Sequence, residues 1–242
     1  MKESDNLMNK DYKLIKGDCL EVMKRIEDNS IDLVVTDPPY KCISGGKPNK
    51  KGQPSGMLSK NDGKIFKHND IKPEVWIKEV YRILKEESQC YIMTNTLNME
   101  NYLRICRETG FKLHNILVWK KNNVTPSRWY MKNAEFTLFL RKGKAKTINN
   151  VGSKMVHEFD NIIGNKKHPT EKPIDLMKLY IENSSNEKDI VLDPFMGGGS
   201  TGIACVDVNR KFIGLELDEK YFEIAKERID NTYKELNKNN IA

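Results

Sequence analysis

The chain of 242 residues lacks several features that would assign it to other classes of protein. Its five cysteines form no Cys-x-x-Cys pair, so we expect neither a disulfide framework nor a zinc or other metal site. We find no long apolar span and no signal peptide, which argues against a membrane protein and predicts a reducing, cytoplasmic location. No internal repeat or linker divides the chain, so a single domain over residues 1–242 is expected.

The composition suits a soluble α/β domain that binds an anion. Hydrophobic residues make up 38% of the chain, which is ordinary for such a domain. The net charge of +7 fits a partner such as nucleic acid. The charge alone would also describe a basic protein that binds nothing.

The most informative segment is Asp37-Pro38-Pro39-Tyr40, which follows an apolar run, 31–36, typical of a buried parallel strand. Ligand sites of open α/β sheets lie at such carboxyl strand ends. Two prolines make the turn stiff and leave carbonyl groups free. A carboxylate and a proline carbonyl can accept both hydrogens of a nucleobase amino group, and Tyr40 can stack on a base taken out of its duplex. An ordinary strand-ending turn is the alternative.

A second motif, residues 189–201, predicts a strand, a turn with three glycines and a helix that continues to about residue 208. Glycines allow close approach of a ligand, and Ser200 or Thr201 can cap the helix. The turn lacks the Gly-x-Gly-x-x-Gly spacing, and Asp193 would repel a diphosphate but attract an ammonium group. Glu216 ends the next strand, 211–216, about 20 positions further on, where α/β folds place a carboxylate on ribose hydroxyls.

The order of these motifs predicts a circularly permuted sheet. After Glu216 the sequence predicts one amphipathic helix, 218–236, and no further strand. A short strand, 12–16, with the turn Gly17-Asp18-Cys19 at the other end of the chain supplies the missing piece. Other predicted elements are helices 74–84, 100–109 and 174–183, and strands 89–95, 115–120 and 135–141.

With these motifs, and with His168-Pro169-Thr170-Glu171-Lys172-Pro173, the chain resembles the amino-methylating DNA methyltransferases that use S-adenosylmethionine, in their β arrangement. The resemblance implies a Rossmann-like, doubly wound, mostly parallel α/β sheet in permuted order. It also implies catalytic roles for Asp37, Pro38, Pro39 and Tyr40. The implied cofactor-binding residues are Asp18, Cys19, Thr170, Lys172, Asp193, Phe195, Gly197, Gly199, Ser200, Thr201 and Glu216. Among them, Asp18 would accept from the adenine amino group of the cofactor, and Thr170 and Lys172 would donate to its methionine carboxylate. Gly198 departs from the family, in which serine is commoner between the glycines.

Two segments are predicted to contact DNA. Residues 41–72 are rich in lysine and glycine and predict a long loop beside the catalytic turn, although a solvated surface loop is the alternative. Residues 121–167 mix basic, amide and aromatic side chains that suit groove and phosphate contacts. The candidate DNA-binding residues are Lys47, Lys50, Lys51, Lys60 and Arg128.

The resemblance implies methyl transfer to the N6 atom of a flipped adenine in double-stranded DNA. Adenine is favoured because the first motif residue is Asp37, where cytosine-N4 enzymes of the family more often have serine; N4-cytosine is the alternative. Methyltransferases for RNA or protein amides would share the cofactor half, but the protein-glutamine enzymes usually begin the turn with Asn. An inactive nucleic-acid-binding module would have damaged motifs, and these are intact. The sequence leaves open the recognition site, a cognate restriction endonuclease and a homodimer.

Overall fold

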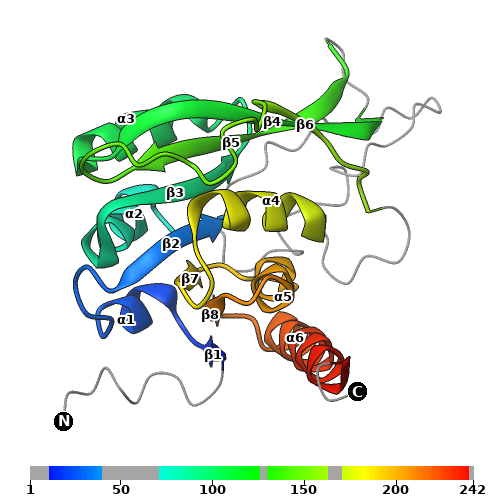
Figure 1. Ribbon diagram of the computed structural model, residues 1–242. Helices are drawn as coiled ribbons and strands as arrows, with labels where there is room; N and C mark the ends of the chain where they lie inside the picture. Colours follow the sequence, from blue (N-terminus) through cyan, green and yellow to red (C-terminus); the bar gives the residue numbers. More distant parts are fainter. Residues whose placement is uncertain (1–10, 40–70, 126–129, 163–170, 240–242) are drawn as a thin grey trace, which may run out of the picture.

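The described part of the chain folds as one eight-stranded sheet covered by helices on both faces (Figure 1). The structure is a computed structural model and describes residues 11–39, 71–125, 130–162 and 171–239. The strands are β1 (Tyr12–Lys16), β2 (Ile31–Thr36), β3 (Leu84–Thr94), β4 (Lys112–Thr125), β5 (Lys132–Arg141), β6 (Val156–Glu158), β7 (Ile190–Asp193) and β8 (Lys211–Glu216). The helices are α1 (Cys19–Met23), α2 (Pro73–Ile83), α3 (Met99–Thr109), α4 (Ile174–Ser184), α5 (Ser200–Asp207) and α6 (Glu219–Asn239).

The sheet has the strand order β1-β8-β7-β2-β3-β5-β4-β6. The first five strands in this order run parallel, β5 is antiparallel to both of its neighbours, and β6 runs parallel to β4. β1 pairs with β8 from Tyr12↔Phe212 to Lys16↔Glu216, so the two ends of the sequence complete one sheet. The permuted, mostly parallel α/β sheet is therefore confirmed.

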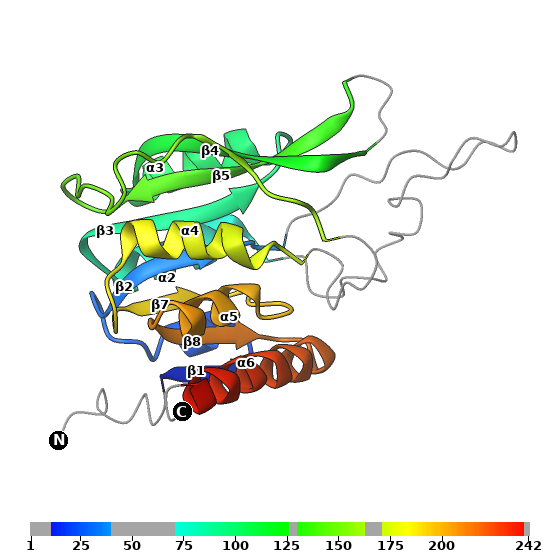
Figure 2. The ribbon, with the colours of Figure 1, turned by 45° about the vertical axis from the view of Figure 1, so that its right-hand side comes forward.

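Alternation along the buried strands separates two hydrophobic cores. Leu33 and Val35 of β2 pack in the core formed with α4, α5 and α6, whereas Val34 packs in the core formed with α1, α2 and α3. Figure 2 shows α4, α5 and α6 together on one face of the sheet. Successive side chains of a strand point to opposite faces, so a strand covered on both sides must be apolar at nearly every position. This explains the nearly continuous apolar run of β2 that leads to Asp37.

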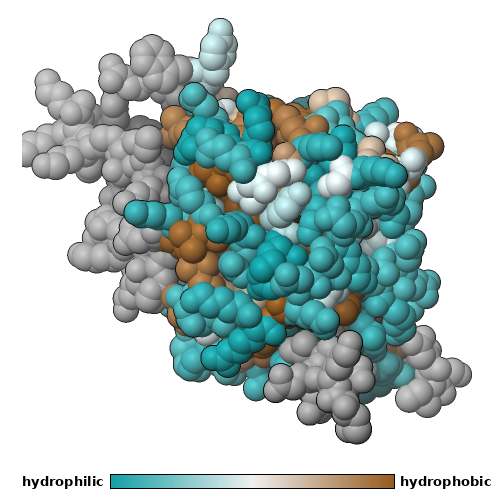
Figure 3. Space-filling model, turned by 90° about the vertical axis from the view of Figure 1, so that its left-hand side faces the viewer, coloured by the Kyte–Doolittle hydropathy of each residue, from teal (hydrophilic) through white to brown (hydrophobic). Residues whose placement is uncertain are grey.

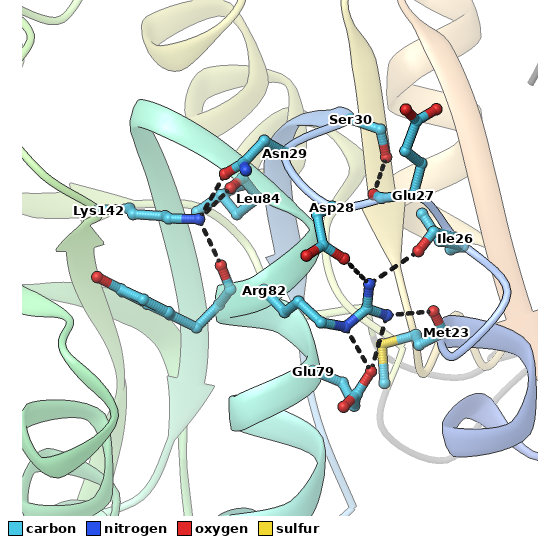
Figure 4. A network of polar contacts seen from close by, with 11 residues as sticks. Met23, Ile26, Glu27, Asp28, Asn29, Ser30, Glu79, Arg82, Leu84 and Lys142 are labelled. Atoms are coloured by element: carbon cyan, nitrogen blue, oxygen red, sulfur yellow. Dashed lines mark hydrogen bonds and ion pairs between the residues drawn. The ribbon is translucent and has the colours of Figure 1, made fainter.

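Two basic side chains fix the amino end of β2 (Figure 4). Arg82, near the end of α2, donates to the carbonyls of Met23 at 2.8 Å and Ile26 at 3.0 Å, which precede β2. Lys142 donates to the carbonyl of Leu84 and to the Asn29 side chain, both at 2.7 Å. Buried backbone carbonyls need such partners. These contacts anchor β2 at the end opposite to Asp37, which leaves its carboxyl end for the site.

The structure differs from the sequence prediction at several helix and strand boundaries. The predicted helix 74–84 ends at Ile83, and β3 begins at once with Leu84, which pairs with Ile31. The pairing shifts register before Leu33, and Glu87 has a φ of 63°, so this first part of the strand is irregular and lacks a clear alternating pattern. Strand β4 is longer than predicted at both ends, and the three-residue strand β6 was not predicted.

The region 121–167, predicted to contact DNA, contributes to the main sheet. Residues Lys121–Thr125 continue β4, Lys132 begins β5, and β6 pairs with β4 from Val118↔Val156 to Lys120↔Glu158. In Figure 2 the paired ends of β4 and β5 reach beyond the neighbouring strands. The opposite side of the molecule, seen in Figure 3, is mostly hydrophilic where it is described. None of the helices in the described ranges has the length and apolar character needed to cross a membrane.

Candidate active site

Three acidic residues meet where three adjacent parallel strands end. Asp37 follows β2, Asp193 is the last residue of β7, and Glu216 is the last residue of β8. Since the carboxyl ends of parallel strands share one edge of the sheet, the acids predicted from separate motifs lie at the same edge. A cavity at this edge is lined by Asp37, Glu171, Lys172, Met177, Asp193, Phe195, Met196, Gly197, Gly198, Ser200 and Thr201.

Asp193 is buried and holds the glycine turn. Its carboxylate accepts from Thr36 Oγ1 at 2.8 Å, Thr201 Oγ1 at 2.7 Å and the Phe195 amide at 3.0 Å. Burial raises its pKa to about 6, although these donors favour the ionised form. A carboxylate has about four lone-pair positions, so three protein donors leave room for one more donor from a ligand.

The glycine turn is fixed by its backbone and by Glu216. The Gly197 amide donates to Glu216 Oε2 at 3.0 Å, and the Asp218 amide donates to Oε1 at 2.8 Å. Gly199 has a φ of +83°, and a Cβ there would lie 3.0 Å from the Cβ of Ala225. A residue other than glycine would therefore be strained and crowded at this position. Burial also raises the pKa of Glu216, against the effect of its backbone donors.

The predicted capping of α5 by Ser200 or Thr201 is wrong. Gly199 is the residue that precedes the helix, and no side chain caps it. Thr201 lies inside the first turn, and its hydroxyl donates to Asp193. That hydroxyl ties the helix to β7 and stabilises a buried carboxylate, which competes with a capping role.

Arg228 of α6 connects the glycine turn to the segment around Lys172. Its guanidinium donates to the Gly198 carbonyl and forms an ion pair with Glu171, with 2.5 Å between Arg228 Nη2 and Glu171 Oε1. Glu171 is buried, and α4 begins at Ile174 immediately after the motif. Two segments predicted to adjoin the cofactor are thus held together by one side chain.

The Gly17-Asp18-Cys19 turn lies beside the end of β8, as the permuted order requires. The Gly17 amide donates to the Glu216 carbonyl at 2.9 Å. The Asp18 carboxylate accepts from the Leu20 amide at 2.8 Å and caps α1, while Cys19 is buried and its thiol pKa is raised to about 12 by burial. Asp18 is exposed and has lone pairs left for a ligand, so its adenine-binding role stays a prediction.

Asp37 belongs to a row of four buried or half-buried charges that the sequence did not predict. Lys172 Nζ forms an ion pair with Asp37 Oδ2 and lies 3.5 Å from Glu135 Oε2. Lys121 Nζ lies 2.5 Å from Glu135 Oε1. Lys172 was predicted to bind the cofactor, but here it contacts the carboxylate of Asp37, the first residue of the predicted catalytic turn. Glu135 and Lys121 carry no local signal, because their sequence contexts are those of ordinary strands.

The other oxygen of Asp37, Oδ1, is buried and has no hydrogen-bond partner within the described residues. Burial is the main influence on the carboxyl and raises its pKa, while Lys172 opposes this and Glu135 adds to it. A buried carboxylate oxygen without a donor is costly unless a ligand supplies one. Pro38, which follows Asp37 directly, is buried, and its ring fixes the backbone angle φ and keeps the turn rigid.

The lining of the cavity fits the expected cofactor. S-adenosylmethionine carries an ammonium and a sulfonium, and the carboxylates of Asp37, Asp193 and Glu171 lie along the cavity. Met177, Phe195 and Met196 supply apolar contacts for the remainder of such a ligand. No group of three or more His, Cys, Asp or Glu residues suited to a metal occurs in the ranges that the structure describes.

Several predicted site residues lie outside the described residues. These are Tyr40 of the catalytic turn, Thr170, and the candidate DNA-binding residues Lys47, Lys50, Lys51, Lys60 and Arg128. The residues that the structure brings together at the carboxyl edge are Asp18, Cys19, Asp37, Pro38, Pro39, Lys172, Asp193, Phe195, Gly197, Gly199, Ser200, Thr201 and Glu216.

The chain is similar to known proteins over most of its length. The sequence model of the N6_N4_Mtase family, described as DNA methylase, matches residues 31–227. The type II methyltransferase M2.MboI of Moraxella bovis is 30% identical over 93% of this chain and 89% of its own length. The solved complex of M1.HpyAVI with S-adenosylmethionine is 28% identical, covers 90% of this chain and 99% of its own, and has a TM-score of 0.68.

A more distant structure agrees in fold alone. The cytosine-N4-specific PvuII DNA methyltransferase is 18% identical, covers 92% of this chain and 91% of its own, and has a TM-score of 0.69. The predicted cofactor, S-adenosylmethionine, is the one bound in the solved M1.HpyAVI complex. The family model spans most of the chain, including the catalytic turn, the Lys172 segment and the glycine turn. The chain belongs to the N6_N4_Mtase family of DNA methylases.

Proposed function

We propose that this protein transfers a methyl group from S-adenosylmethionine to the N6 amino group of a flipped adenine at a specific site in double-stranded DNA, in the cytoplasm. The observation that carries the proposal is the state of Asp37. One of its oxygens is paired with Lys172, and the other is buried with no hydrogen-bond partner in the described residues. An amino group of a base can supply the missing donor.

The bound cofactor supplies an electrophilic methyl group on a sulfonium. Asp37 Oδ1 accepts one amino hydrogen, and the carbonyl of Pro38 accepts the other, so the nitrogen lone pair turns toward the methyl group. As the N–C bond forms, the S–C bond to the methyl group would break and the positive charge would pass from sulfur to nitrogen, where the fixed negative charge of Asp37 stabilises it. The nitrogen would then lose one amino proton through Asp37 Oδ1 to water. Catalysis then consists mainly of positioning and electrostatic stabilisation, without a covalent intermediate.

Asp193 and Glu216 are proposed to hold the cofactor. Asp193 is proposed to accept from its ammonium and Glu216 from its ribose hydroxyls. Both carboxylates also fix the glycine turn through the Phe195 and Gly197 amides. Cofactor binding and the shape of the turn are therefore linked through the same two side chains.

The choice of adenine is tested by the product. Digested DNA that has been methylated by the protein is expected to contain N6-methyladenine, because Asp37 opens the catalytic turn. Mass spectrometry of the nucleosides identifies the base directly. N4-methylcytosine as the only product would replace adenine by cytosine and keep the rest of the proposal. DNA that gains no methyl group with S-adenosylmethionine present would remove the proposal.

The lysine-rich segment 41–72 is proposed to bind DNA phosphates. All of its lysines except Lys72 lie outside the described residues, so this prediction depends on the sequence. Changing Lys47, Lys50, Lys51 and Lys60 to Gln should flatten the slope of log K against log salt by about 0.9 per lost contact, about 3 to 4 units in total. A salt titration of DNA binding measures the slope, and specificity should change less than affinity.

A matched variant controls for total charge. Lys24, Lys112, Lys144 and Lys188 are exposed and lie near the opposite edge of the sheet, so changing these four to Gln should alter the salt slope much less. Affinity for S-adenosylmethionine should stay the same in both quadruple variants. An equal slope change in the two would show that segment 41–72 contributes only net charge.

A further inference from the structure

The row of charges behind Asp37 crosses the sheet from strand to strand. Asp37 follows β2, Glu135 lies in β5 and Lys121 lies in β4, while Lys172 comes from the segment before α4. In the sheet, β5 and β4 lie on the far side of β3 from β2. The charges alternate in sign along the row Asp37, Lys172, Glu135, Lys121, and their formal sum is zero.

The row is more enclosed than a surface ion pair. The side chains of Lys172, Lys121 and Glu135 are 8%, 14% and 26% exposed. In the neighbouring pair, Lys120 of β4 and Glu158 of β6 are 50% and 70% exposed. An exposed pair costs little to form and contributes little, whereas enclosed charges carry a desolvation penalty that good geometry only partly offsets. A row of enclosed charges that ends at a catalytic carboxylate therefore calls for an explanation beyond stability.

We propose that Glu135 and Lys121 are positioning residues for methyl transfer: they hold Lys172 against Asp37 Oδ2, keep Asp37 Oδ1 available to the target amino group, and influence the charge state of Asp37. This inference rests on the proposed function of Asp37. Lys172 lies between two carboxylates, so its position depends on both of them. Glu135 in turn is held by Lys121.

The charged and titratable groups around Asp37 shift its pKa in different directions. Burial raises the pKa of Asp37 most, Lys172 opposes it, Glu135 raises the pKa and Lys121 lowers it. On the other packed elements, Asp193 of β7 is a second buried acid whose pKa is raised mainly by burial, and Tyr102 of α3 stays neutral because burial and Asp37 raise its pKa. Glu135 and Lys121 thus influence the same carboxyl with opposite signs, although neither touches it.

Because Glu135 and Lys121 shift the pKa of Asp37 in opposite directions, their removal should shift the pH dependence of the rate in opposite directions. The rate should rise with pH as Asp37 ionises. Glu135→Gln removes a negative charge, so Asp37 ionises more easily and the acidic limb of the rate profile should move to lower pH. Lys121→Met removes a positive charge, so the limb should move to higher pH. Each shift should be about one pH unit or less, because a charge in contact shifts a pKa by about 1–3 units and these charges lie further away.

The experiment measures the single-turnover rate of transfer of a labelled methyl group from S-adenosylmethionine to DNA, over a pH range that contains the acidic limb of the parent and extends about one unit beyond each expected shift. Saturating enzyme and cofactor separate the rate from binding, and the readout does not depend on which base is methylated. Lys120→Met is the matched control, since it removes a lysine from the same strand but from an exposed pair. The double variant Lys121→Met/Glu135→Gln should return the limb toward that of the parent protein.

The outcomes separate the two proposals. A parent protein that transfers no methyl group counts against the proposed function. A parent that is active, with limbs that coincide in the parent and both variants, overturns the positioning role. A purely structural role would lower the melting temperature without moving the limb in opposite directions. If Glu135→Gln fails to fold, the positioning role is judged from Lys121→Met alone, whose acidic limb should move to higher pH. Lys121→Arg should restore the parental limb because it keeps the charge.

Discussion

Replacing Asp37 by Asn is expected to reduce the rate of methyl transfer by about 10²–10³-fold or more, while affinity for S-adenosylmethionine stays close to that of the parent protein. The Lys172 ammonium can only donate hydrogen bonds, so the amide oxygen of Asn would take the position of Oδ2 and face it. The amide NH₂ would then occupy the position of Oδ1 and present a donor to the amino group of the target base. The variant therefore changes an acceptor into a donor with almost no change of shape. Single-turnover transfer and calorimetric titration of the cofactor measure the two effects separately.

Asp193→Asn is the contrasting variant at the neighbouring strand end. At the Oδ1 position its amide oxygen can still accept from Thr36 and from the Phe195 amide, and its NH₂ can donate to the Thr201 hydroxyl, but the charge that is proposed to attract the cofactor ammonium is lost. A charge-assisted hydrogen bond is worth about 1.5–3 kcal/mol, so cofactor affinity should fall by about ten- to a hundredfold. Equal cofactor affinities in the Asp37 and Asp193 variants would contradict the division of roles between the two acids.

The elements that sequence predicted best are those whose local pattern admits one interpretation. β1, β2 and β8 have the expected bounds, because each is a short apolar run followed by a turn. The predicted helix 100–109 ends at the expected residue, and Gly110 with a φ of 116° follows it. The first part of β3 was missed because Glu87 and a register shift interrupt its alternation, and β6 was missed because three residues carry no periodic signal. The pairing of β1 with β8 was predictable only from the order of the motifs.

The site was predictable as a set of strand ends but not as a network. Asp37, Asp193 and Glu216 were found because acids directly after buried strands must share one edge of the sheet. The partner of Asp37 was not found, because Lys172 is 135 positions away in the sequence and its motif suggests a cofactor ligand. Glu135 and Lys121 lie in β5 and β4, and the sequence pattern of these strands predicts nothing more for them than ordinary positions in a sheet. Contacts of this kind depend on tertiary packing, which local sequence does not encode.

Lys172→Met is expected to cause the largest loss of stability among these variants. The lysine is the cation between two enclosed carboxylates, Asp37 and Glu135, and a methionine of similar length leaves both without it. Removing one partner of a buried ion pair typically costs about 3–5 kcal/mol. For a chain of this length, the melting temperature should fall by on the order of 10 °C. Lys120→Met, which breaks only an exposed pair, should cost about 0–1 kcal/mol.

The pH dependence identifies the cause of this loss. Without Lys172, the folded-state pKa of Asp37 lies further above its unfolded value of about 3.9, because burial already raises it. A group with a raised folded pKa favours the folded state at low pH, and that contribution is lost as pH rises through the folded pKa. The deficit of Lys172→Met relative to the parent should therefore be small near pH 4 and should grow as pH rises through the folded-state pKa of Asp37. Denaturant unfolding at several pH values measures it. Adding Asp37→Asn to Lys172→Met should recover part of the lost stability at pH 7, because the uncompensated buried charge is gone. If the deficit is independent of pH and Asp37→Asn does not relieve it, Lys172 stabilises the fold through packing of its aliphatic chain.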